Sequence, residues 1–339
     1  MPERSAVLVA AATEIAAVFD HGGRLLVTGE GRAAADACHV AVEFLHPVIT
    51  GKRALPAAVG AERAGPGDVV LAIGYGGAHV SGRAEVAIAD HAVPGARHVI
   101  ELPGDDAFAA KEAALASYHV LWELVHVFLD DAVSDGGAAG ELDALYPMLY
   151  RQQGADMSAA IDAAIASTDE KLAETAVLRA ESLAANDEQL SLAAHFLADA
   201  PTVFTFGNGG SATDAADLAW ALGTKGWALG DDVATVTALA NDVSFDVVFA
   251  RQLATLARPG DVAVGLSTSG TSANVLAGLR EARRLDMATI GLAGYDGGTM
   301  ATAELDVCCV VHSTSVHRIQ ESYVTLYDEM LRRAGVPAR

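Results

Sequence analysis

The feature that most constrains the fold of this 339-residue chain is one local pattern that occurs twice: an apolar run, a glycine-containing loop and an alanine-rich helical stretch. In the second half the pattern runs from Val203–Phe206 into the loop Gly207–Ser211. In the first half it runs from Arg24–Thr28 into the loop Gly29–Arg32. When the two loops are aligned, the residues after them correspond at a constant offset of 178. The chain is therefore predicted to be an internal duplication.

Two further correspondences extend the duplication. Pro66–Val70 matches Pro259–Ala263 at an offset of 193, and a predicted helix over 108–129 matches one over 318–332 at an offset of 209. The first increase in offset means that the second copy has about 15 more residues between its two loops. This extra length contains Asn241–Asp242, which has no counterpart in the first copy.

Two loops of the second copy have the chemistry of an anion site. Glycines in Gly207–Ser211 let the backbone approach a ligand, and the first turn of the next helix supplies free N–H groups and the positive end of its dipole. A second apolar run, 261–266, leads into Ser267–Ser272, which carries five hydroxyl groups. At the carboxyl ends of neighbouring parallel strands the two loops would form one phosphate cradle. Neither is a Walker loop or a Gly-x-Gly-x-x-Gly loop, so no nucleotide cofactor is expected.

Alternating strands and helices predict an α/β fold with two domains, each a parallel sheet flanked by helices in a three-layer, flavodoxin-like or Rossmann-like arrangement, with the N-terminal copy shortened. We predict an N-terminal domain over 1–130, a linker over 131–156 and a C-terminal domain over 157–339. Two helices are expected in 157–199, with a break at Asn186–Asp187. The strands expected after Val203–Phe206 lie near 235–239, 262–266, 288–292 and 306–311.

Composition narrows the class of protein. The formal net charge of −22 argues against a nucleic-acid-binding or anionic-membrane surface. The three cysteines, Cys38, Cys308 and Cys309, have the spacing of neither a disulfide framework nor a zinc site. The apolar N-terminal run contains Glu14, and no uncharged stretch is long enough to span a bilayer. We therefore expect a cytoplasmic protein that holds an anionic ligand by local dipoles.

Five short motifs follow one another in a distinctive order. They are Gly207–Ser211, Asn241–Asp242, Leu266–Gly270, Asp296–Gly298 and Arg318–Glu321. Together they resemble the sugar isomerase (SIS) fold and, within it, the phosphoheptose isomerases, over about residues 155–335. The resemblance implies an aldose–ketose isomerase that converts D-sedoheptulose 7-phosphate into a heptose 7-phosphate through an enediol. It also implies oligomers, here a homodimer of tandem chains that forms a pseudo-tetramer.

The resemblance also assigns the binding residues. Asn208 and Gln320 are expected to point toward the sugar, and Asp242 is expected near its hydroxyl groups. Thr271 is assigned to capping the next helix. The predicted phosphate contacts are Gly209, Ser211, Ser267, Thr268, Ser269 and Ser272.

The second copy lacks the residues that carry the chemistry in the family. In the phosphoheptose isomerases, the helix after the first glycine loop has a histidine and, four residues later, a glutamate. Their C-terminal helix has a glutamine and, eight residues later, a histidine. This copy has Asp217 and Ala221 at the first pair, and Asp328 eight residues after Gln320. Asp217 and Asp328 are then either remnants or a weak metal site.

The first copy has the opposite pattern. It carries His39 and Glu43 at the first pair, and Lys111 and His119 at the second, while Gly74–Gly77 replaces the hydroxyl-rich loop. Each copy thus retains what the other has lost. We expect one composite site, in which the second copy holds the phosphate, Glu43 is the general base and His119 moves the oxygen protons.

Several alternatives stay open at this point. His126 lies two helical turns after His119 and is a second candidate for the catalytic histidine. His39, Glu43 and His119 could bind zinc, with Lys111 as either a substitute for the metal's charge or a solvated lysine. A different class of function, a non-catalytic sugar-phosphate sensor or scaffold, would need the cradle alone.

Overall fold

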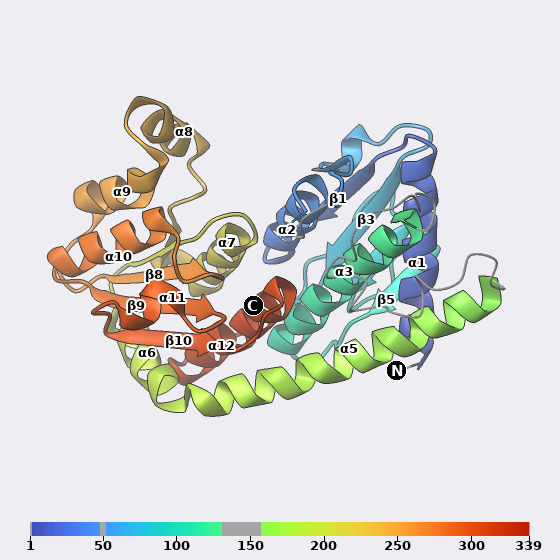
Figure 1. The fold of residues 1–339 in the computed structure, drawn as a ribbon. Coiled ribbons are helices and arrows are strands. Elements are labelled where there is room, and N and C mark those ends of the chain that lie inside the picture. The colour runs from blue at the N-terminus through green and yellow to red at the C-terminus, as the bar shows by residue number, and fades with distance from the viewer. Residues whose placement is uncertain (1, 48–51, 131–156, 339) are drawn as a thin grey trace. The chain divides into compact units, whose positions relative to one another are not determined.

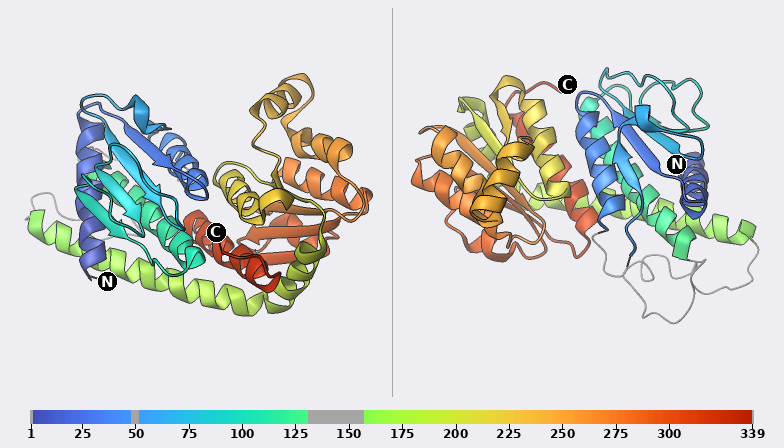
Figure 2. Two further views of the ribbon diagram at one scale, coloured as in Figure 1. Left: turned by 180° about the vertical axis from the view of Figure 1, so that it is seen from behind. Right: turned by 90° about the horizontal axis from the view of Figure 1, so that it is seen from above.

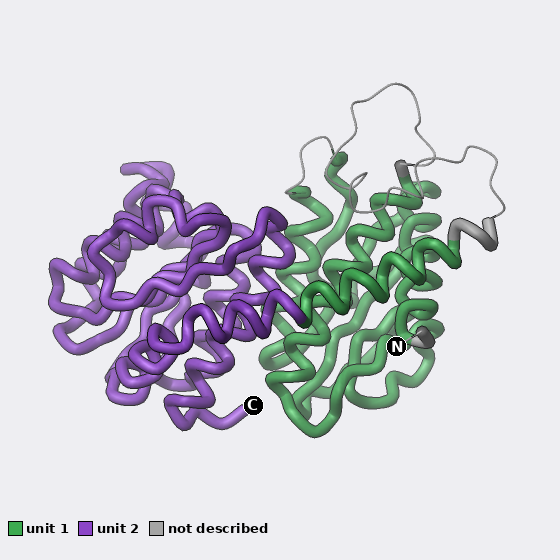
Figure 3. Tube along the Cα trace, turned by 60° about the horizontal axis from the view of Figure 1, so that its bottom comes forward, with its two compact units in different colours: residues 1–176 green, residues 177–339 purple. Residues whose placement is uncertain are grey.

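The computed structural model describes residues 2–47, 52–130 and 157–338. By its internal contacts the chain divides into two compact units, residues 1–176 and 177–339, called here the N-terminal and C-terminal units (Figure 3). The division lies inside the long helix α5 (Met157–Ala185), later than the predicted domain start at 157. The predicted linker 131–156 lies outside the described residues.

Polar contacts explain why the first part of α5 belongs to the N-terminal unit. The Ser5 hydroxyl donates to Asp169 Oδ1 at 2.7 Å, and the buried Lys171 forms an ion pair with Glu123. Helix α6 (Asp187–Asp199) follows α5 directly, so the predicted break at Asn186–Asp187 is confirmed. Among the described helices, none has the length and apolar character needed to span a membrane.

The N-terminal unit contains a five-stranded parallel sheet in the order β2-β1-β3-β4-β5 (Figure 1). Helix α3 packs against both α1 and α2. The strands are β1 (Leu25–Gly29), β2 (Ala57–Val59), β3 (Val69–Gly74), β4 (Val86–Ala89) and β5 (His98–Glu101), and the helices are α1 (Pro2–Asp20), α2 (Ala33–Leu45), η1 (Ala61–Arg63) and α3 (Ala107–Asp130).

The C-terminal unit contains a second five-stranded parallel sheet, in the order β10-β9-β8-β6-β7. Its strands are β6 (Val203–Phe206), β7 (Gly226–Ala228), β8 (Val262–Ser267), β9 (Ala288–Gly294) and β10 (Val307–Val311). Besides α6, its helices are α7 (Gly210–Leu222), η3 (Gly223–Lys225), α8 (Val233–Asp242), η4 (Phe245–Val247), α9 (Val248–Leu256), α10 (Ala273–Arg284), α11 (Gly298–Thr302) and α12 (Val316–Arg333).

Strand register confirms the duplication. Leu25 pairs with Val69 in the first sheet, and Val203 pairs with Val262 in the second, which reproduces the offsets of 178 and 193. In chain order both sheets have the same arrangement, in which the second strand lies at one edge and the first lies beside the third. This is the flavodoxin-like order, and it leaves a crevice where the connections from two adjacent strands run in opposite directions.

The two copies differ in what covers their strands. In the C-terminal unit α10 packs on β8, β9 and α9, while α12 packs on α6 and α7, so helices cover both faces of the sheet (Figures 1 and 2). In the N-terminal unit, within the described residues 52–130, no helix separates β3 from β4 or β4 from β5, and loop residues Val80, Ala84 and Val93 pack on the alanines of β3 and β4. The prediction of a shortened N-terminal copy is therefore confirmed.

One predicted strand is wrong. Residues 235–239 lie in helix α8, because Asp232 caps the helix by accepting a hydrogen bond from the Thr235 amide at 3.0 Å. No residue of this helix is buried, so no sheet packing favours the extended form for its β-branched residues. The edge strand is instead β7, where a side chain at Gly226 would overlap the backbone of Ala219 on α7.

Candidate functional site

The two hydroxyl and glycine loops of the C-terminal unit meet as predicted. The loop Gly207–Ser211 follows β6 and the loop Ser267–Ser272 follows β8, and these strands are adjacent, with Phe206 opposite Gly265. Since β6 and β8 lie at the point where the connections diverge, both loops border the crevice at the carboxyl edge of the sheet. We call these two loops the phosphate cradle.

The first loop is pressed against the start of α7. A side chain at Gly207 would lie 2.5 Å from the carbonyl oxygen of Ser211, and Gly209 has a φ of +55°, a conformation that glycine adopts without strain. The Ser211 amide donates to the carbonyl of Asn208 at 3.0 Å. This packing holds the first turn of α7 at the crevice, with the positive end of the helix dipole toward a ligand.

The second loop presents a connected set of hydroxyl groups. Ser267 Oγ lies 2.9 Å from Ser272 Oγ and 3.4 Å from Ser269 Oγ, and Ser269 Oγ lies 2.9 Å from Thr271 Oγ1. Because each hydroxyl rotates to suit its partner, the set can turn its donors toward an anion. Thr271 was assigned to the helix cap, but the N-cap residue is Ser272, and Thr271 joins the hydroxyl set.

The Asp296–Gly298 motif packs against the backbone of this second loop. A side chain at Gly270, which has a φ of +64°, would overlap the carbonyl of Gly297, and one at Gly298 would lie 2.5 Å from the carbonyl of Ser269. The Met300 amide donates to the carbonyl of Gly270 at 2.9 Å. The glycines of the motif are thus explained by close backbone packing against the cradle.

Two asparagines link the loops. Asn208 Nδ2 donates to Asn274 Oδ1 at 2.9 Å, and Asn274 Nδ2 donates back to Asn208 Oδ1 at 2.8 Å. Asn274 is buried and lies in the first turn of α10, whereas Asn208 is partly exposed. Sequence reasoning missed Asn274, although its place directly after the hydroxyl loop was a usable signal.

Gln320 lies in the first turns of α12, which pack against the cradle. Its neighbour Ile319 lies against Gly294, and the Tyr323 hydroxyl donates to the carbonyls of Ser267 and Leu292, both at 3.1 Å. Burial raises the pKa of the Tyr323 phenol well above its ordinary value, so it stays a donor.

Gln320 itself is 2% exposed, and its Oε1 accepts no hydrogen bond from any residue of the described parts of the chain. A buried acceptor of this kind costs roughly 1–3 kcal/mol when unpaired. A ligand hydroxyl that donated to it would recover that cost.

Asp242 is the predicted binding residue with the least structural support. It is exposed at the end of α8, and its carboxylate accepts a hydrogen bond from Asn241 at 2.8 Å. No hydrogen bond among the described residues joins it to the cradle. Its role near the substrate hydroxyls stays a prediction.

In the N-terminal unit, the packing of α2 on α3 brings the two predicted catalytic residues, Glu43 and His119, together with the predicted metal ligand His39. His39 Nε2 lies 3.6 Å from Glu43 Oε1, and the rings of His39 and His119 meet edge to face with centroids 5.3 Å apart. All three side chains are buried. The Trp122 indole donates to the Glu43 carbonyl at 2.8 Å, which joins α3 to the helix that carries the pair.

His126 lies in a different environment from His119. Its ring is 4.1 Å from that of Trp122 and 6.0 Å from that of Phe44, and its Nδ1 donates to the Trp122 carbonyl at 3.0 Å. His119 is therefore the candidate whose ring lies against His39, and His126 is held within an aromatic group.

Lys111 is neither solvated nor an obvious metal ligand. It is 1% exposed, and its ammonium forms an ion pair with Asp36 Oδ1 at 2.5 Å. Asp36 also accepts hydrogen bonds from the hydroxyls of Tyr118 at 3.0 Å and Tyr75 at 2.5 Å. This polar cluster, which sequence reasoning missed, joins α2, α3 and the loop after β3.

Tyr75 also explains why the N-terminal unit has no cradle of its own. The offset of 193 puts Tyr75 at the place of Thr268, so a buried ring stands where the other copy has a loop hydroxyl. Arg32, in the first glycine loop, lies over the ring of Phe108 at 5.4 Å.

The predicted zinc site does not fit the observed arrangement. Within the described ranges no group of three or more His, Cys, Asp or Glu side chains is arranged to hold a metal ion. Lys111, at the family's glutamine position, is a cation paired with Asp36 and offers no lone pair. No proton transfer proposed for this chain is therefore routed through zinc.

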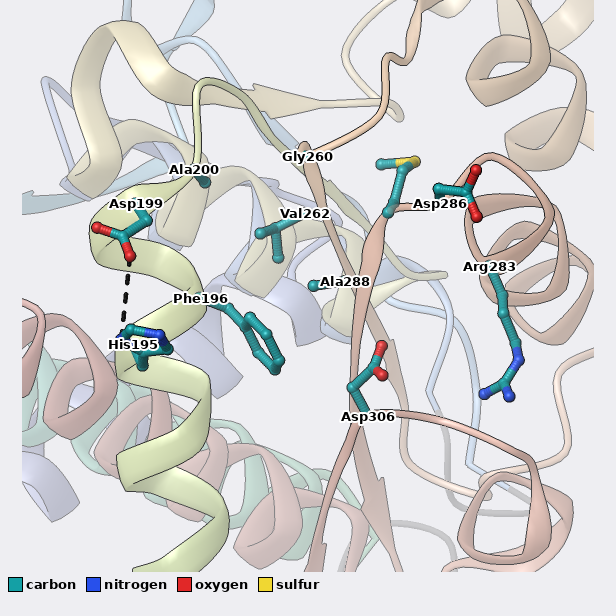
Figure 4. A pocket seen from close by; sticks show the side chains of 11 residues that line it. His195, Phe196, Asp199, Ala200, Gly260, Val262, Arg283, Asp286, Ala288 and Asp306 are labelled. Carbon is teal, nitrogen blue, oxygen red and sulfur yellow. Dashed lines mark ion pairs between the residues drawn. The ribbon is translucent and has the colours of Figure 1, made fainter.

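A large pocket of the C-terminal unit lies away from the cradle. This cavity of about 590 Å³ is bordered by Val262 and Ala288, the first residues of β8 and β9, and by Phe196 of α6 (Figure 4). It is therefore at the amino edge of the sheet, whereas the cradle is at the carboxyl edge. None of the predicted site residues lines it.

Part of the chain matches a known protein family. The family model described as "SIS domain" matches residues 165–294. The phosphoheptose isomerase of Roseiflexus sp. is 43% identical over 129 residues, which cover 35% of this chain and 65% of the relative, just under two thirds of its length. The phosphoheptose isomerase of Geotalea daltonii is 42% identical over 146 residues, which cover 40% and 76%.

One solved structure is similar over nearly the whole chain. The C-terminal domain of glucosamine-fructose-6-phosphate aminotransferase from Francisella tularensis covers 99% of this chain and 93% of its own length, with a TM-score of 0.58. At 11% sequence identity this likeness shows the fold alone.

Proposed function

The chain belongs to the SIS domain family. We propose that it is an aldose–ketose isomerase that converts D-sedoheptulose 7-phosphate into a heptose 7-phosphate. The observation that carries the proposal is the phosphate cradle, in which two glycine- and hydroxyl-rich loops meet at the carboxyl edge of the sheet. The curated relatives that match this unit are named phosphoheptose isomerases, which supports the same reaction class.

Phosphate binding rests on neutral donors. Ser211, Ser267, Ser269 and Ser272 offer hydroxyl groups, and Gly209 and Thr268 lie in the same loops at the starts of α7 and α10. A hydrogen bond to a charged group contributes about 1.5–3 kcal/mol, so a few suffice to hold a phosphate. Local donors are needed because the formal net charge of −22 repels an anion at a distance.

The proton transfers are proposed for the N-terminal unit. Glu43 would take a proton from C1 of the open-chain ketose to form an enediol and return it to C2. His119 would move the oxygen proton from the C1 hydroxyl to the C2 oxygen. In the C-terminal unit, Ala221 stands at the place of Glu43 and Asp328 at the place of His119. Each unit therefore holds one half of the required set, and the composite site predicted from the sequence stays part of this proposal.

The proposal also includes an oligomeric state and a cellular location. We propose a homodimer of tandem chains, as the resemblance implies, and a cytoplasmic reaction, in keeping with three free cysteines. Light scattering of the purified protein measures the first of these directly.

The test is turnover of sedoheptulose 7-phosphate by the purified protein, followed by NMR, with and without added zinc. Ser267→Ala and Glu43→Gln are assayed beside it, together with calorimetric binding of the sugar phosphate. Activity that is lost in both variants supports one site with groups from both units. Binding without turnover by the unmodified protein would reject the isomerase and leave the sensor or scaffold as the function.

A further inference from the structure

We propose that Asn274 is a positioning residue for sugar recognition, which acts by fixing the side chain of Asn208. This inference rests on the proposed function of the phosphate cradle, and it adds a residue that neither the motifs nor the comparisons assign. The two asparagines are 66 residues apart in sequence: Asn208 lies in the first loop of the cradle, and Asn274 lies in the first turn of α10, directly after the second loop.

The side chains of Asn208 and Asn274 form a reciprocal pair of hydrogen bonds. Each amide donates to the other, at 2.9 Å and 2.8 Å, so neither side chain can rotate without breaking both bonds. Asn274 is 3% exposed and Asn208 is partly exposed. The buried Asn274 side chain therefore fixes the position of the Asn208 side chain, which borders the crevice.

The orientation of the two side-chain amides is fixed by a backbone hydrogen bond. A reciprocal amide pair alone would be equally satisfied if both amides were reversed. The Val275 amide donates to Asn274 Oδ1 at 3.0 Å, which requires the oxygen to lie on that side. The orientation of Asn274 then decides that of Asn208.

The fixed Asn208 side chain can still bind a ligand. After its two bonds to Asn274, the Asn208 amide keeps one N–H and one acceptor lone pair, both with defined directions. A side chain held in this way binds a sugar hydroxyl without losing rotamer entropy. The hydroxyl groups of Ser267–Ser272 bond among themselves and do not depend on Asn274.

Substitution of Asn274 should therefore affect binding of the sugar and leave binding of the phosphate group nearly unchanged. Asn274→Ala should weaken binding of sedoheptulose 7-phosphate about tenfold, the effect of one lost hydrogen bond of ordinary strength, and should leave inorganic phosphate within about twofold. In turnover the loss should appear in KM, with kcat nearly unchanged. Asn274→Leu fills the same space without polar atoms and should behave alike, which separates the lost hydrogen bonds from a cavity.

The decisive experiment is a double-mutant cycle measured by calorimetry, with unmodified protein, Asn208→Ala, Asn274→Ala and the double variant. If Asn274 acts through Asn208, its substitution has no further effect in the Asn208→Ala background. Additive losses, or unchanged sugar-phosphate binding by both Asn274 variants, would overturn the inference. So would an equal loss of inorganic phosphate binding, which would indicate collapse of the whole loop. Absence of sugar-phosphate binding by the unmodified protein would instead overturn the proposed function itself.

Discussion

Tyr118 of the N-terminal unit and Tyr327 of the C-terminal unit occupy equivalent positions at the offset of 209. In each unit the tyrosine donates a hydrogen bond to an aspartate on the helix that follows that unit's first glycine loop. Tyr118 bonds Asp36 Oδ1 at 3.0 Å, and Tyr327 bonds Asp217 Oδ2 at 2.5 Å. The two aspartates are not equivalent, since Asp217 aligns with His39, one helical turn later. The interhelical bond has thus been kept in both copies, while the residue that accepts it differs.

The first prediction concerns the proposed base. Glu43→Gln should lower kcat by roughly 10²–10⁴, because general base catalysis typically contributes that much, and should leave KM nearly unchanged. The measurement is steady-state turnover of sedoheptulose 7-phosphate. Glu101→Gln, at an exposed position at the end of β5, is the matched control and should retain full activity. Equal activity of the two variants would remove Glu43 from the mechanism.

The second prediction tests the packing beneath the cradle. Gly270→Ala combines a positive φ with overlap on the Gly297 carbonyl, so it should destabilise the fold by about 1–3 kcal/mol and weaken phosphate binding. Gly260→Ala also has a positive φ, of +90°, but meets no atom within 4 Å. It should cost stability through backbone strain alone and bind phosphate normally. Urea unfolding and calorimetry compare the two, and equal phosphate affinity in both would contradict the packing role.

The third prediction concerns the buried ion pair of Lys111 and Asp36. Lys111→Met leaves a buried carboxylate without its cation and should destabilise the protein by about 3–5 kcal/mol. Adding Asp36→Asn removes the stranded charge and should restore a large part of that loss. Chemical denaturation of the two variants measures the difference. A double variant no more stable than Lys111→Met would show that the charges are not coupled.

The fourth prediction is a pH dependence of stability. Asp68 accepts hydrogen bonds from the side chain and amide of Arg24 and from the Gly65 amide, which holds the pKa of its carboxyl well below the ordinary value. A depressed folded-state pKa contributes stability above the unfolded-state value, near 4, that is lost as the pH falls toward the folded value. Asp68→Asn should therefore be less stable than the unmodified protein at pH 7, and the difference should shrink below pH 4. A difference that does not change with pH would contradict this.

The fifth prediction is the number of ligands per chain. Because the Tyr75 ring stands where the other copy has Thr268, the N-terminal unit should bind no phosphate of its own. Titration calorimetry should give one sugar phosphate per chain. Two per chain, with Tyr75 unchanged, would show that the N-terminal crevice is open to ligands.

Much of the fold was predictable because its information is local. A helix was expected directly after the loop Gly29–Arg32, and α2 begins there, at Ala33. The four-residue spacing of His39 and Glu43 is enough to put both on one face of that helix. Residues 235–239 were predicted wrongly because β-branched residues favour strands only when a sheet packs against them, and the Asp232 cap favoured a helix instead.

The duplication, the parallel α/β architecture and the two loops of the cradle could be predicted from the amino-acid sequence, because glycine positions, hydroxyl runs and hydrophobic periods act over a few residues. Three contacts became known only from the folded structure: Asn274 pairs with Asn208, Asp36 binds Lys111, and the ring of His119 rather than that of His126 lies against His39. These contacts join residues 66 to 80 positions apart. They depend on how helices and loops pack in three dimensions, which no local pattern in the chain encodes.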